Sequence, residues 1–339
     1  MNVDADDTTP SSEPSNASPE RHDILWFPDG NVVLQTDTYL FRVHKSVLSL
    51  HSSVFKDMFE LPTVEDGASD EIMADDTAGM KALEETYEGV PLVALVGDKG
   101  EDVAHLLRTV YDHGYYISRS DDHPLCKITA ILVLSTKYAF ESIRTDVIGH
   151  LLKHYPMTLS EFDMVDDDQA TVFQDLRCFQ HFKLLKAALV ADADVLLPGL
   201  FYVCSDFDLG HIAQSLRETL DKESTWRLLK GRDHLSLAFK RIQWIYLSES
   251  EACVKLHAPN QPTFDQFRLK DPEATAVFDT LTLKDVSGDK LVSTWPHRVC
   301  TNCGERLEKL INEEREKIWE ELPSYFALPD WDILRAALE

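Results

Sequence analysis

Short apolar runs separated by turn residues open the chain, and they predict strands. A turn signal at residues 28–31 is followed by an apolar run that ends near residue 35, and a second turn leads into the apolar segment 39–44. Two such runs joined by a tight turn are typical of paired strands. Ser46 and Ser52-Ser53 suit the starts of two short helices that continue to Phe59. This opening predicts a compact α+β arrangement.

Helical periodicity dominates the rest of the chain. After a third strand at residues 90–96, apolar residues at positions 103, 106, 107, 110 and 111 mark one face of an amphipathic helix. Two more helices are expected at about 125–140 and 143–155. Further candidate helices are 169–191, 194–205, 209–222, 223–230 (ended by Gly231), 232–248 and 304–321. Residues 250–300 contain several turn residues and predict irregular structure or short strands.

Segments without periodicity divide the chain. Residues 1–22 are rich in Ser, Pro and Asp and predict a disordered acidic tail. Residues 60–88 hold ten acids and one lysine, which predicts a flexible insertion. Pro156 and the acidic segment 161–168 mark a domain boundary. We therefore expect an α+β domain over residues 23–158 and a mainly α-helical C-terminal domain over residues 159–339.

The charge balance narrows the function classes. The chain has 33 Lys and Arg against 59 Asp and Glu, a formal net charge of −26. Such a surface disfavours direct binding of nucleic acid or of anionic membranes. No apolar run approaches the length of a membrane helix, and the acidic N-terminus lacks the apolar core of a signal peptide. Six cysteines without an export signal predict reduced thiols and a cytoplasmic or nuclear location.

Three segments of the first half match one family in combination. They are Asn31-Val32-Val33-Leu34, the run from Phe41 to Leu48, and the run from Ser52 to Phe59. Their order and spacing resemble the opening of a BTB/POZ domain, whose pattern is an Asp-led strand, Phe-x-x-His-Lys/Arg-x-x-Leu, Ser-x-x-Phe and a Met-Phe pair. The acidic insertion and the segments that follow it look like the fungal, especially basidiomycete, branch. The resemblance covers residues 24–155.

The resemblance implies a protein-interaction module that forms homodimers and has no active site. In many members it also implies docking of a cullin, so that the second domain delivers substrates for ubiquitylation. The family places an Asp and a basic residue in a buried pocket at the dimer seam, whereas this chain has Asn31 and Lys45 there. An amide cannot neutralise the charge of Lys45, so either this lysine is solvated or another acidic residue forms an ion pair with it. The residues expected at the dimer or partner interface are Asn31, Lys45, Val47, Leu48 and Val54, with Leu50 in the same exposed-looking apolar set.

A Cys-x-x-Cys-Gly sequence is the sharpest local signal of chemistry. Cys300 and Cys303 could reach one metal ion from a tight turn, and Cys253 and His257 are the natural second pair of ligands for a structural zinc site. The alternative is a pair of ordinary thiols at the start of the last helix. A redox Cys-x-x-Cys motif is typically found next to a βαβ pattern, which the sequence lacks. Apart from this zinc, we expect no cofactor.

The spacing of polar residues reveals no catalytic constellation, so we expect a non-catalytic protein. The thirteen histidines show no other clustering, and residues 166–168 are expected to be a solvated linker rather than a calcium loop. Two alternatives stay open. One is an enzyme with its site in the C-terminal half, using residues among Asp206, Asp208, His211 and His234. The other is an acidic transcription regulator.

Overall fold

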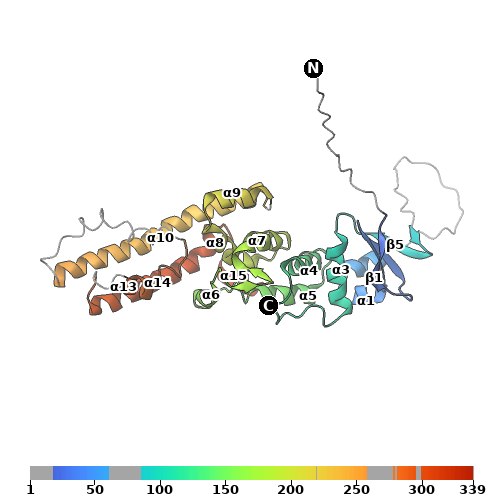
Figure 1. Cartoon of the computed structure of the whole chain (residues 1–339), viewed down its shortest axis with the longest axis horizontal. Helices are drawn as coiled ribbons and strands as arrows, with labels where there is room; N and C mark the ends of the chain where they lie inside the picture. Colours follow the sequence, from blue (N-terminus) through green and yellow to red (C-terminus); the bar gives the residue numbers. More distant parts are fainter. Residues whose placement is uncertain are drawn as a thin grey trace, which may run out of the picture. The chain divides into compact units, whose positions relative to one another are not determined.

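The computed structural model describes residues 18–60, 85–218, 220–257, 278, 281–294 and 299–338 (Figure 1). The chain forms two compact units, Met1–Asp112 and His113–Glu339. The first is built on a small mixed sheet and the second is mainly helical, which confirms the α+β class. The first unit ends earlier than the domain that we expected to end at residue 158. Since a compact unit and a family domain need not end together, that boundary stays a prediction.

A five-stranded sheet organises the first unit, with strand order β1-β3-β2-β5-β4. The strands are β1 (Glu20–Trp26), β2 (Val32–Gln35), β3 (Tyr39–Val43), β4 (Thr86–Tyr87) and β5 (Val90–Ala94). Strands β2 and β3 pair antiparallel, whereas β2 pairs parallel with β5 and β3 pairs parallel with β1. Consecutive residues Val32, Val33 and Leu34 are all fully buried, so both faces of β2 are covered.

Three helices complete the described part of this unit: α1 (Lys45–His51), α2 (Ser53–Glu60) and α3 (Gly100–Tyr111). The three expected strands and all three helices are confirmed. Two strands were not expected. Strand β4 is short, and β1 begins at Glu20, so the last residues of the expected tail belong to the sheet. Residues 1–17 and 61–84, which include most of the tail and of the acidic insertion, lie outside the described residues.

Helices form most of the second unit. The first part comprises α4 (Leu125–Lys137), α5 (Glu141–Leu151), α6 (Leu159–Val165), strands β6 (Thr171–Val172) and β7 (Asp175–Leu176), η1 (Arg177–Phe179), α7 (His181–Val190), η2 (Asp194–Leu196) and α8 (Leu197–Ser205). The second part comprises α9 (Leu209–Glu218), α10 (Lys222–His257), α13 (Gly288–Thr294), α14 (Thr301–Tyr325) and α15 (Trp331–Ala336). Every residue of α8 is buried, so this helix lies at the centre of the core.

Two long helices lie side by side as an antiparallel pair. Helix α10 has 36 residues, about 54 Å of helix, and packs along the 25-residue α14 (Figure 1). Their direction follows from the contacts. Arg241 pairs with Glu314 and Glu321, while Glu249, further along α10, pairs with Arg306 near the start of α14. The end of α10 therefore meets the start of α14.

The sequence prediction that Gly231 ends a helix is wrong, because α10 continues through this residue. Gly231 is there because the helix passes very close to another side chain. A Cβ at this position would lie 2.0 Å from the ring of Phe326, which is fully buried. The prediction of irregular structure from residue 250 is also wrong at its start, since α10 extends to His257.

The expected helix 169–191 is a β-hairpin followed by a shorter helix. Strands β6 and β7 are joined by Phe173 and Gln174, which both have positive φ angles, 52° and 67°. Two-residue hairpin turns need this conformation at both positions, and usually take Asn and Gly there. The side chain of Gln180 donates hydrogen bonds to the carbonyl groups of Val172 and Asp175 and so holds the hairpin closed.

The expectation of a solvated linker at residues 166–168 is wrong for Asp166. Residues 159–165 form α6, and the Asp166 carboxylate, of which 11% is exposed, accepts a 2.8 Å hydrogen bond from the buried guanidinium of Arg177. Asp163 pairs in the same way with Arg315 of α14, at 2.6 Å. A buried guanidinium needs a charged partner, so these two carboxylates compensate the charges of arginines inside the core. Within the described residues, no helix is both long and apolar enough to cross a membrane.

The tight contact at Gly231 predicts an unusual response to substitution. Gly231→Ala should destabilise the protein by about 1–3 kcal/mol in chemical denaturation, although Ala favours helix, because the new methyl group collides with Phe326. The ring cannot move freely, since it stacks on Phe201 at 5.0 Å. Gly149→Ala is the matched control. Gly149 is an exposed residue of α5 with open space around it, and its substitution should stabilise by about 0.5–1 kcal/mol. Equal stabilisation by both substitutions would contradict the contact.

Candidate functional site

The α1–α2 hairpin carries the residues expected at a partner interface, and the structure divides them. The Leu48 side chain is fully buried within the unit, so it offers no exposed surface to a partner in this structure. Val47 and Val54 are half-buried. Leu50, on the opposite side of α1, is 78% exposed and is the clearest apolar anchor of the hairpin surface.

Asn31 and Lys45 lie together, but not as a charged pair. The Asn31 side-chain oxygen accepts a 2.8 Å hydrogen bond from the backbone N–H of Lys45, the first residue of α1. This bond satisfies an N–H group that the helix itself leaves free. The Lys45 ammonium lies 5.4 Å from the ring centre of Phe59, and no carboxylate of the described residues pairs with it. Asn31 therefore caps the helix, and an aromatic face rather than an acid faces Lys45.

Strand β1 is one edge of the five-stranded sheet. Its pairing with β3 is parallel and is interrupted between Arg21 and Trp26, so the strand is irregular. An edge strand presents unpaired backbone groups along its outer side, which another chain can pair with. Ile24 of β1 is 53% exposed. The edge of β1 and the surface of α1–α2 are thus two described features of this unit that suit protein contacts.

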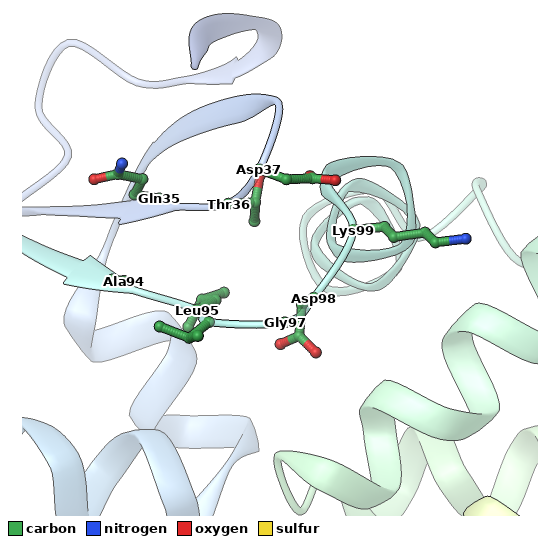
Figure 2. Close-up of a pocket in the computed structure, with 9 residues that line it drawn as sticks. Gln35, Thr36, Asp37, Ala94, Leu95, Gly97, Asp98 and Lys99 are labelled. Atoms are coloured by element: carbon green, nitrogen blue, oxygen red, sulfur yellow. The ribbon is translucent and has the colours of Figure 1, made fainter. Parts of the chain in front are cut away.

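A hollow of about 340 Å³ lies between the β2–β3 turn and the loop from β5 to α3. Asp37 in this turn accepts a 2.8 Å hydrogen bond from the N–H of Gly100 at the start of α3, so its carboxylate already serves the fold. Figure 2 shows the side chains of Gln35, Asp98 and Lys99 pointing in different directions. The polar groups around the hollow therefore do not converge on one ligand position.

Three cysteines meet where α10 ends and α14 begins. The sulfurs of Cys253, Cys300 and Cys303 all lie within 4.8 Å of one another. Cys253 is buried in α10, and the other two are half-buried at the N-cap and in the first turn of α14. The backbone N–H of Cys300 donates a 3.2 Å hydrogen bond to the Cys253 sulfur. The side chain of His257, the fourth expected ligand, lies outside the part of the chain that the structure describes.

The two cysteines of the Cys-x-x-Cys sequence differ in acidity. Hydrogen bonds from the backbone and the thiol of Cys303 lower the pKa of Cys300. Interaction with the sulfurs of Cys300 and Cys253 raises the pKa of Cys303 to about 12. Of these two cysteines, Cys300 is therefore the more acidic.

A second cluster of metal-ligand side chains was missed by the sequence prediction, which found no clustering of histidines. Nε2 of His150 and Nε2 of His154 both lie 2.9 Å from one carboxylate oxygen of Asp121. His150 lies in the last turn of α5, and His154 lies four residues later, in the turn that follows the helix. That spacing is visible in the sequence, but Asp121 reaches them only through the fold.

The protonation of this cluster follows from its contacts. The hydroxyl of Tyr116 lies 2.9 Å from Nδ1 of His150, and burial raises the pKa of this tyrosine, so its O–H donates to the ring. His150 is then neutral, with its proton on Nε2 facing Asp121. Burial lowers the pKa of His150, and the hydrogen bonds from both histidines lower the pKa of Asp121 despite its partial burial. The cluster is thus a closed hydrogen-bond network that needs no ion.

The four residues proposed for an enzyme site have structural tasks. Asp206 accepts hydrogen bonds from the N–H of Leu281 and the hydroxyl of Thr282. Asp208 accepts from the N–H groups of Gly210 and His211 and thereby caps α9, and these bonds lower its pKa. The ring of His211 stacks on Phe207, and that of His234 lies edge-on to Tyr325. The two carboxylates are therefore occupied by local backbone groups.

Residues 29–83 match the family model of the BTB/POZ domain. The match spans β2, β3, α1 and α2, the elements that carry Asn31, Lys45 and the hairpin surface. A BTB/POZ domain is a protein-interaction module, typically non-catalytic, that mediates self-association and binding to other proteins. Searches among curated proteins and among solved structures found no match.

The buried histidines of the helical unit predict acid sensitivity. Burial lowers the pKa values of His150 and His181 below their ordinary value of 6.5. As the pH falls below 6.5, the unfolded chain takes up protons that the folded chain resists, so stability is lost. Each histidine steepens this loss by up to about 1.4 kcal/mol per pH unit. Urea unfolding of the full chain between pH 7.5 and pH 5 measures the slope.

The comparison of slopes separates the buried histidines from the others. His150→Gln should flatten the dependence on pH, even if it also lowers stability at every pH. His113→Gln, at an exposed histidine of the same unit, should leave the slope unchanged. Identical slopes for the wild type and His150→Gln would contradict the assignment.

Proposed function

We propose that this chain is a non-catalytic interaction protein that self-associates through its BTB/POZ unit and binds another protein with its helical unit. The match of residues 29–83 to the BTB/POZ domain carries this proposal. The α+β organisation of the first unit supports it, because strands β2 and β3 and the α1–α2 hairpin lie within the matched residues. The fungal branch remains a hypothesis that rests on the sequence resemblance alone.

Self-association through the edge of β1 and the α1–α2 surface suits the physical character of both. The edge strand offers backbone hydrogen bonds, and Leu50 offers an exposed apolar side chain beside the half-buried Val47 and Val54. Two copies that each carry a charge of −26 repel one another, so the contact must exclude water from apolar groups to hold. Lys45, which has no acid partner among the described residues, is free to meet an acid of the second copy.

A stripe of exposed apolar residues on α10 supports partner binding by the helical unit. Trp226, Leu237 and Trp244 are 69%, 53% and 66% exposed. Successive members are about three and about two helical turns apart, so all three lie on one face of the helix. Tryptophans are frequent anchors of protein interfaces, because each buries a large area with little loss of freedom. Many BTB/POZ proteins bind a cullin, and we include a cullin as one hypothesis for the partner.

The proposal predicts a homodimer of twice the 38.5 kDa chain mass in light scattering at tens of micromolar protein. The measurement needs about 0.15 M salt, which screens the repulsion between the acidic copies. Leu50→Glu should weaken the dimer about tenfold or more, since a charge would be buried in an interface of at least about 1,200 Å².

Val96→Glu is the matched control for this experiment. Val96 is another highly exposed apolar residue of the same unit, but it lies in the loop after β5, away from β1 and α1–α2 in the sequence. It should leave the dimer intact. A wild-type monomer at these concentrations, or equal weakening by both variants, would refute association through this surface.

The stripe on α10 predicts where partners bind. Crosslinking mass spectrometry of the full chain in its native cell should place partner crosslinks along Lys230 and Lys240, which lie near the stripe on α10. Trp226→Ala combined with Trp244→Ala should lose these partners and keep the dimer. Recovery of a cullin at micromolar concentration would identify that partner. Unchanged crosslinks in the double variant would contradict the role of the stripe.

A further inference from the structure

We propose that Cys253, Cys300 and Cys303 bind one Zn²⁺ ion that joins the end of α10 to the start of α14. No other described group of the protein brings three sulfurs together. The ligands come from two helices whose cysteines are far apart in the sequence, so this convergence is a product of the fold. Binding one ion there would be a structural role, separate from the interaction surfaces above.

The spacing of the sulfurs suits the ion. Zn–S bonds of about 2.3 Å in a tetrahedron place sulfurs about 3.8 Å apart. The three sulfurs already lie within 4.8 Å of one another, so shifts of about 1 Å or less at half-buried side chains complete the geometry. Cys300 and Cys303 stand one turn apart at the beginning of α14, which lets both approach the same point from the same side.

A backbone hydrogen bond links the cysteines of the two helices. The Cys253 sulfur accepts the N–H of Cys300, and a negatively charged sulfur accepts such a bond more strongly than a thiol does. Gly304 follows the pair and lets α13 come close, since a Cβ there would lie 3.2 Å from Val292 and 3.7 Å from Val299. Cys300 and Cys303 are partly exposed, which leaves a path for the ion.

The fourth ligand expected from the sequence is His257. It stands four residues after Cys253 in the sequence, and its side chain lies outside the described part of the chain. Three thiolates and one imidazole form a closed tetrahedral set, typical of structural zinc, with no position for a reactive water.

The ion would act as a clamp at one end of a long helix pair. Along the middle, α10 and α14 are joined by the two ion pairs of Arg241. A further ion pair, between Glu249 and Arg306, lies closer to the cysteines. Beyond it, the chain between the helices includes residues 258–277, outside the described residues. A metal bound there holds two helix ends together by coordination rather than by packing.

Metal analysis of the full-length protein, purified without chelator, tests the proposal. We expect about one zinc per chain, and at least about a fivefold loss in Cys253→Ser, Cys300→Ser and Cys303→Ser. Cys126→Ser is the matched control, because Cys126 is an exposed thiol of α4, and it should keep its zinc. Loss of zinc in Cys126→Ser as well, or equal zinc in all variants, would indicate loose binding to the acidic surface and overturn the site.

Titration of the reduced, metal-free wild type with Co²⁺ alone decides the question even where a variant fails to fold. Three thiolates around tetrahedral cobalt give an intense sulfur-to-metal charge-transfer band and strong visible bands that saturate at one equivalent, and Zn²⁺ should abolish both. Absence of these bands overturns the proposal. A Cys300–Cys303 disulfide in freshly isolated protein, detected by mass spectrometry under alkylation, overturns it too and assigns the pair a redox role.

His257→Ala tests the fourth position separately. If His257 is a ligand, the variant should bind cobalt more weakly, with visible bands shifted by the change of ligand. An unchanged spectrum and affinity would remove His257 from the site and leave the three thiolates as its protein ligands.

Discussion

The packing of α10 against α14 is the contact on which the helical unit depends. It is set at one end by Gly231, whose missing side chain admits the ring of Phe326, and at the other by the convergence of Cys253 with Cys300 and Cys303. Between these ends, Arg241 bridges to two glutamates of α14. Because helices this long must remain in register at both ends, a shift of one turn would break the aromatic contact and separate the cysteines together.

Buried cations connect this pair to the rest of the unit. Arg315 of α14 donates to the carbonyl of Leu283 and pairs with Asp163 of α6, and Arg177 pairs with Asp166 just after α6. Removing one partner of such a buried pair typically costs about 3–5 kcal/mol, because the other charge is left without compensation. Trp319 adds a neutral link, since its indole N–H donates to the carbonyl of Met157. Some of the acidic residues are therefore paired with buried arginines, and the remaining acids set the charge of the surface that other proteins contact.

The two units differ in the kind of contact they offer. The first has an edge strand and an exposed leucine on a short helix, which suit association between copies of the chain. The second presents exposed tryptophans on a long helix, and such side chains lose little conformational freedom on binding. In contrast, the polar clusters found among the described residues of this unit are occupied by contacts within the chain. Asp121, His150 and His154 satisfy one another, and Asp206 and Asp208 bind backbone groups, so their chemistry stabilises the fold.

Local patterns in the sequence determined the strands at Val32, Tyr39 and Val90, the short helices that follow, and the amphipathic helix that ends at Tyr111, because each depends on neighbouring residues alone. The Cys-x-x-Cys sequence and its expected partner Cys253 were visible in the same way, although only the fold brings their sulfurs together. The hairpin at residues 171–176 was not visible, because Phe173 and Gln174 adopt a backbone conformation that glycine usually marks, and Gln180 holds them there. Gly231 was misread for the converse reason, since a glycine that admits a distant ring looks in the sequence like one that ends a helix. The burial of Leu48 and the approach of Asp121 to two histidines also depend on residues distant in the chain, so only the tertiary structure decided them.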